Sequence, residues 1–136
     1  MSAVPEATVA RVVGEISERL ADPTYAQVAV GELVESQPAV SRYLSGRTGA
    51  LGSGEAVIHA AFHCGTLAAC FRAHRGVPAL TPVSFADLDA ASGPDVAGRF
   101  AAAEPALASY VATNVDGDAL RETLALVGLA MAGRGT

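Results

Sequence analysis

The sequence contains no tryptophan and no lysine, and it is poor in charged residues and in cysteine. Charged residues make up 17% of the 136 positions, and the net charge is −5. This acidic balance argues against nucleic acid or anionic lipid as a partner, because both require a basic face. Two cysteines cannot build a disulfide framework, so we expect a protein of the reducing cytoplasm.

The N-terminal segment also lacks the features of a signal peptide. Its first thirteen residues, MSAVPEATVARVV, contain neither a basic region nor a continuous apolar run. Small and apolar residues are abundant instead, with 51% of the chain hydrophobic. We predict one helical domain over residues 1–136, with a sizeable core and enough remaining apolar surface to favour a homo-oligomer.

No segment alternates apolar and polar residues as a half-buried strand does. The sequence therefore predicts an all-α, single-domain bundle of about five to seven helices. Its centre is expected at Ser53–Arg75, a segment without proline that is apolar nearly all round. Three stripes on this helix indicate burial: Val57, Ala60, Cys64, Leu67 and Phe71; Ile58, Phe62 and Ala69; and the small residues Ala61, Gly65 and Ala68, which would permit close approach of another helix.

Local signals place the remaining helices. Proline and capping residues mark their starts, a serine–aspartate capping box begins a short helix at Ser84, and Pro105 predicts a break near Ala103–Glu104. The glycines between positions 46 and 54 predict a flexible connection. The other expected helices are Pro5–Leu20, Thr24–Ser36, Pro38–Leu44, a broken run near Asp95–Asn114, and a last one ending near Ala132.

All three histidines fall on one face of the predicted central helix. At about 100° per residue, Glu55, His59, His63, Cys70 and His74 lie within an arc of roughly 100°. Imidazoles four residues apart can share one metal ion, as in helical zinc sites. Candidate metal ligands are therefore His59 and His63 with Glu55, and more weakly Cys70 with His74; each pair would need ligands from another helix.

The alternative is that these histidines are structural, since four-residue spacing alone merely places two residues on one side. Ala60 follows His59 where the zinc-protease motif has glutamate, and Glu55 is one residue too far for a di-iron motif. Catalysis has no clear support either: adjacent residues His63 and Cys64 point about 100° apart, and no third group orients them. We therefore expect no cofactor and no enzymatic activity.

A second motif lies before the central helix. Ser36–Arg47, SQPAVSRYLSGR, resembles the recognition helix of bacterial helix-turn-helix regulators, and the preceding VGELVE resembles the support helix. The resemblance implies that Gln37, Ser41 and Arg42 are exposed and contact DNA. Glu32 and Glu35 lie close by, which is unfavourable for phosphate binding.

The sequence thus leaves three functional hypotheses. The first is a non-enzymatic cytoplasmic protein that acts through protein contacts, as a homo-oligomer. The second is a metal- or haem-binding helical protein that uses His59 and His63. The third is a helix-turn-helix DNA-binding regulator. We rank them in this order, because no catalytic constellation is present and the acidic charge disfavours DNA.

Overall fold

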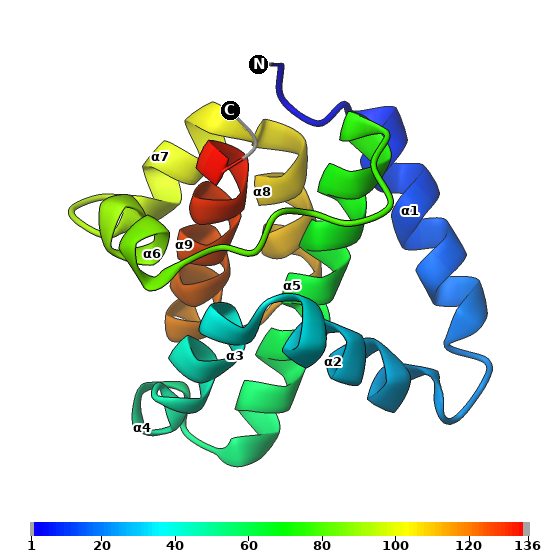
Figure 1. Ribbon diagram of the computed structural model, residues 1–136, viewed down its shortest axis with the longest axis horizontal. Helices are drawn as coiled ribbons and strands as arrows, with labels where there is room; N and C mark the ends of the chain where they lie inside the picture. Colours follow the sequence, from blue (N-terminus) through cyan, green and yellow to red (C-terminus); the bar gives the residue numbers. More distant parts are fainter. Residues whose placement is uncertain (1, 135–136) are drawn as a thin grey trace.

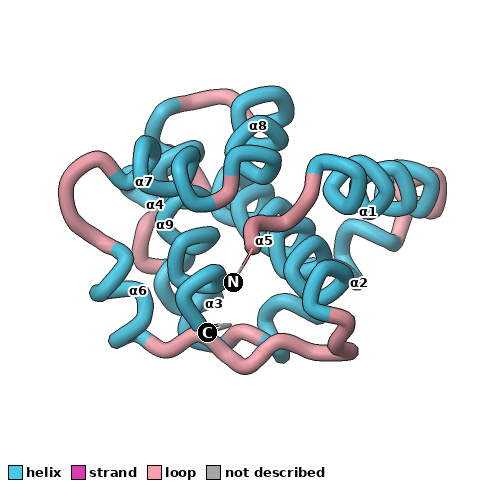
Figure 2. Tube along the Cα trace, turned by 90° about the horizontal axis from the view of Figure 1, so that it is seen from above, coloured by secondary structure: helices cyan, strands magenta, loops and turns pink. Residues whose placement is uncertain are grey.

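The chain folds into a bundle of helices around a long central helix (Figure 1). The computed structural model describes residues 2–134, and within this range it contains nine helices and no strand (Figure 2). The all-α prediction is confirmed, although the helices outnumber the five to seven expected. They are α1 (Glu6–Arg19), α2 (Tyr25–Ser36), α3 (Pro38–Ser45), α4 (Thr48–Leu51), α5 (Gly54–Arg75), α6 (Phe85–Ala91), α7 (Val96–Ala103), α8 (Pro105–Asn114) and α9 (Asp118–Arg134).

Helix α5 is the central element, as its apolar sequence predicts. The Ser53 side chain caps its start by accepting a hydrogen bond from the amide of Ala56 at 3.1 Å. Gly76, in the left-handed conformation, ends it. Between these points α5 packs against α1, α2, α3, α4 and α9. Among the described residues it alone has the length and apolarity of a membrane span, a test that the core helix of a soluble protein also passes.

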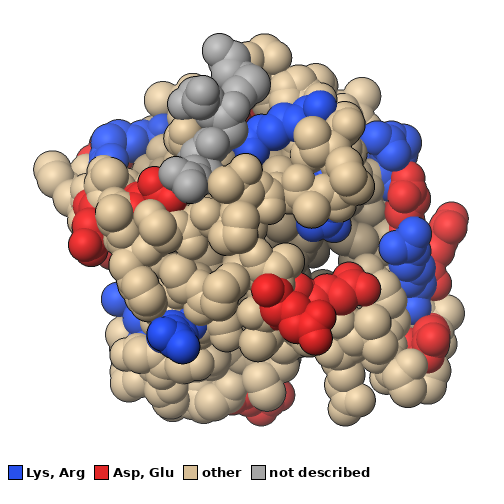
Figure 3. All heavy atoms as spheres, in the orientation of Figure 1, with Lys and Arg blue, Asp and Glu red and all other residues tan. Residues whose placement is uncertain are grey.

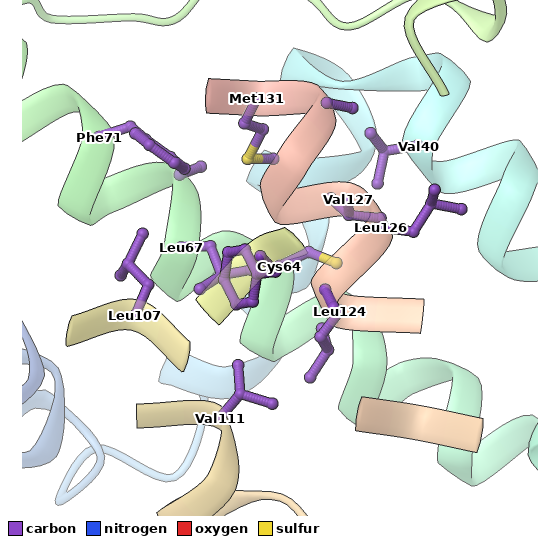
Figure 4. Close-up of a cluster of buried hydrophobic side chains, with 14 of the residues drawn as sticks. Val40, Cys64, Leu67, Phe71, Leu107, Val111, Leu124, Leu126, Val127 and Met131 are labelled. Atoms are coloured by element: carbon purple, nitrogen blue, oxygen red, sulfur yellow. The ribbon is translucent and has the colours of Figure 1, made fainter. Parts of the chain in front are cut away.

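The core forms where α5 meets α9, with α8 and α3 at its edges. Figure 4 shows apolar side chains from these four helices converging on one another. Their packing removes apolar surface from water, which is the main favourable contribution to folding. The labelled members of this cluster are Val40, Cys64, Leu67, Phe71, Leu107, Val111, Leu124, Leu126, Val127 and Met131.

The signals read from proline and capping residues are confirmed. Ser84 and Asp87 form a reciprocal capping box at the start of α6, with hydrogen bonds of 3.1 and 2.9 Å. Pro105 separates α7 from α8, because it cannot donate the hydrogen bond that would continue the helix. Glu104, at this break, is buried and accepts a hydrogen bond from the amide of Val4 at 2.9 Å.

The glycine-rich connection differs from the prediction. We expected a flexible segment between positions 46 and 54, but the chain forms the one-turn helix α4 there. Gly52, with φ of 102°, ends this turn in a conformation that favours glycine. The connection packs onto α9 through Arg47, whose Nε donates to the hydroxyl of Thr123 at 3.0 Å. No local sequence pattern indicates this long-range contact.

Candidate functional site

The histidine face of α5 opens onto an apolar hollow. The hollow has a volume of about 620 Å³ and lies between the end of α1, α2, the first half of α5 and the end of α8. Within residues 2–134, no aspartate, glutamate, arginine, serine or cysteine lines it. Its lining consists of Leu20, Ala26, Gln27, Val30, Ile58, His59, Phe62, His63 and Asn114.

The hollow exists because the part of α5 that carries Ile58 and Phe62 is less buried than we predicted. Ile58 belongs to the second apolar stripe, which we expected to be buried. Its exposed fraction is 57%, and Phe62, one turn later, is only partly buried. Helix α2 packs on the next part of α5, where the carbonyl oxygen of Ala29 lies near Gly65. The prediction for Ile58 is therefore wrong, and an apolar side chain remains accessible beside the two histidines.

His63 is the better anchored of the two histidines. It is half-buried, and its Nδ1 lies 2.8 Å from the hydroxyl of Tyr110 on α8. Burial lowers the pKa of His63, and the nearby His59 lowers it further, so the imidazole is neutral at pH 7. Burial also raises the pKa of Tyr110, against a smaller opposing effect of the Thr66 hydroxyl. The Nε2 atom of His63 has no hydrogen-bond partner among residues 2–134.

His59 is held much more loosely. Its side chain is 62% exposed, and its Nε2 lies 4.0 Å from Oε1 of Glu55, which is 82% exposed. A contact of this length between two solvated side chains contributes little to stability. His59 is therefore available to a ligand or partner that enters the hollow, whereas His63 is already oriented by Tyr110.

One chain does not assemble a complete metal site around these residues. Among residues 2–134, no three histidine, cysteine, aspartate or glutamate side chains are grouped closely enough to hold an ion. Glu55 thus does not join His59 and His63 as a third ligand in this arrangement. A site built on this face needs ligands from outside the chain.

The structure does not present Cys70 and His74 as a second pair. Cys70 is fully buried, and burial raises the pKa of its thiol to about 11, which disfavours the thiolate that binds metals. The Nε2 atom of His74 lies 3.2 Å from both the hydroxyl and the carbonyl oxygen of Ser2. His74 thus contacts the N-terminal segment, away from the hollow.

The segment that resembles a recognition helix corresponds to α3 and the residue before it. Gln37 is 1% exposed, and its Oε1 accepts a hydrogen bond from the amide of Val83 at 2.8 Å. The prediction that Gln37 is exposed to contact DNA is therefore wrong. Arg42 is exposed and Ser41 is half-buried. Acidic side chains gather over the neighbouring α2, beside a hollow in the surface (Figure 3).

Sequence analysis missed the residues that other helices contribute to the hollow. Asn114 on α8 and Leu20 at the end of α1 line the hollow, and Tyr110 on α8 contacts His63 beside it, so no spacing within α5 indicates these three residues. The one local signal is the four-residue spacing of Tyr110 and Asn114, which places both on one side of α8. In the structure, Nδ2 of Asn114 donates to the carbonyl oxygen of Tyr110 at 2.9 Å.

Comparison of this chain with protein-family models, curated proteins and solved structures gives no match. Function is therefore inferred from the residues of the chain itself. The hollow offers apolar contact area, two imidazoles and the side-chain amides of Gln27 and Asn114. Apolar area with a few polar groups is typical of binding sites.

Proposed function

We propose that this chain is a non-enzymatic helical protein that acts through protein contacts, and that a second copy of the chain covers the histidine hollow. The observation that carries the proposal is the hollow itself, which is apolar, uncharged and open to solvent. Ile58 lies at its edge with 57% of its surface exposed, and Leu20 is 46% exposed. Clustered apolar surface of this kind marks contact sites in soluble proteins.

The charge of the chain favours a second copy as the occupant. Two copies with a net charge of −5 repel each other, so they approach at least cost through a face without acidic side chains. The lining of the hollow meets this condition. The hollow also lies beside the protruding Ile58, so a two-fold arrangement can seat Ile58 of each copy in the hollow of the other.

Val34 on α2 extends this apolar face. It is 46% exposed and follows one turn after Val30, which lines the hollow, so the two side chains share a side of the helix. Val34 therefore adds apolar area to a contact centred on the hollow.

Sedimentation equilibrium of the metal-free protein tests this function. We expect self-association of the wild type at micromolar concentration and at least tenfold weaker association of Ile58→Asp, because the substitution places a carboxylate in each copy's apolar contact. Phe85→Asp is the matched control: Phe85 is 50% exposed on α6 and does not line the hollow. A monomeric wild type, or equal losses in both variants, would contradict the proposal.

A further inference from the structure

The two histidines point to a metal site that is shared between copies. We infer that His59 and His63 of one chain, together with the same two residues of a second copy, bind one zinc-type divalent cation. The inference rests on the proposed self-association through the hollow. It adds a bound cation to the contact between copies, which apolar packing alone would not require.

The spacing of the two histidines suits bidentate coordination. His59 and His63 are four residues apart on the regular helix α5, so their Cβ atoms are about 5–6 Å apart. From that separation two imidazoles can reach one ion at zinc–nitrogen distances of about 2.0–2.1 Å. Both side chains line the same hollow. Each chain therefore presents a pair of ligands toward its partner.

The surroundings of His63 are those of a prepared ligand. Histidines that bind metals usually hold their second ring nitrogen in a hydrogen bond, which fixes the orientation of the ring. The contact of 2.8 Å between Nδ1 and the hydroxyl of Tyr110 performs this function and leaves Nε2 without a partner in the described chain.

The ligand count explains why two copies are needed. Among residues 2–134 no third histidine, cysteine or carboxylate joins the pair, so one chain provides half of a tetrahedral site. A two-fold axis beside the hollow brings two such pairs together and closes the coordination with four imidazole nitrogens. The cation would also reduce the repulsion between two chains that each carry a charge of −5.

Titration of the full, tag-free chain with Zn²⁺ tests the shared site. We expect calorimetry to give one Zn²⁺ for every two chains, and sedimentation equilibrium to show association at least about tenfold tighter with the ion than with chelator. Co²⁺ in place of Zn²⁺ should give the visible absorption of a tetrahedral site. His59→Gln and His63→Gln should each abolish these effects. His74→Gln, which changes a histidine bound to Ser2, should leave them intact.

The outcomes separate this inference from the proposed function. Association without metal that Zn²⁺ does not tighten would overturn the shared site and leave the protein contact standing. A chain that is monomeric in chelator but binds Zn²⁺ as a dimer, one ion for two chains, would support the site and overturn self-association as an apolar contact. One ion per chain with unchanged sedimentation, or binding retained in His59→Gln, would overturn the shared site.

Discussion

At the scale of single residues, burial controls the chemistry of the two cysteines. Burial raises the pKa of Cys64 to about 12 and that of Cys70 to about 11, and both residues have no exposed surface. The reactive thiolate is therefore scarce at pH 8, and reagents cannot reach it. We predict that Ellman's reagent labels the folded protein at less than about one tenth of its rate with the unfolded chain. Rapid labelling of one thiol in the folded state would show that α5 opens locally.

Gln37 provides a second test at this scale. Its Oε1 is the acceptor for the buried amide of Val83, and this bond ties the loop before α6 to the start of α3. We predict that Gln37→Ala lowers the free energy of unfolding by about 1–3 kcal/mol, because a buried donor loses its partner. Urea unfolding measures the change.

Glu35→Ala is the control for that substitution, because Glu35 is exposed on α2 and does not line the histidine hollow. Its effect should stay within about 0.5 kcal/mol. If Gln37→Ala costs no more than this, water replaces the amide acceptor and the loop is not held by Gln37. Gln37→Ala should also leave any binding of DNA unchanged, since the Gln37 side chain does not reach the surface.

At the scale of helices, alanine substitutions at two glycines should change the stability of the fold in opposite directions. A Cβ atom on Gly128 of α9 would overlap the ring of Phe100, which lies in the core. We predict that Gly128→Ala destabilises the fold by about 1–3 kcal/mol, because α9 and α7 must separate. Gly14 in α1 has open space around it, so Gly14→Ala should stabilise by about 0.5–1 kcal/mol. Thermal unfolding compares the two, and equal signs would contradict the close packing of α7 on α9.

The helices themselves were largely predictable because their signals are local. Ser53 and the Ser84–Asp87 box contact backbone amides within three residues, and Pro105 breaks the helix at its own position. Helix α4 was missed, since the glycines around its single turn predict a flexible segment and its contact with α9 joins Arg47 to the distant Thr123. The residues of the candidate site were likewise predictable only in part. The four-residue spacing indicated His59 and His63, whereas Tyr110 is brought to His63 only by the packing of α8.

At the scale of the whole molecule, the acidic charge and the hollow without charged side chains predict how salt should act on the proposed self-association. The Debye length falls from about 30 Å at about 0.01 M salt to about 3 Å at about 1 M. Salt therefore screens the repulsion between two chains of charge −5 and leaves an apolar contact intact. We predict that the metal-free association becomes severalfold tighter across this range, as measured by sedimentation equilibrium. The control is Ile58→Asp, which adds two carboxylates to the contact and should depend on salt more steeply than the wild type. Association that weakens with salt would mean that ion pairs hold the copies together, and the contact would then lie on a charged face instead of the histidine hollow.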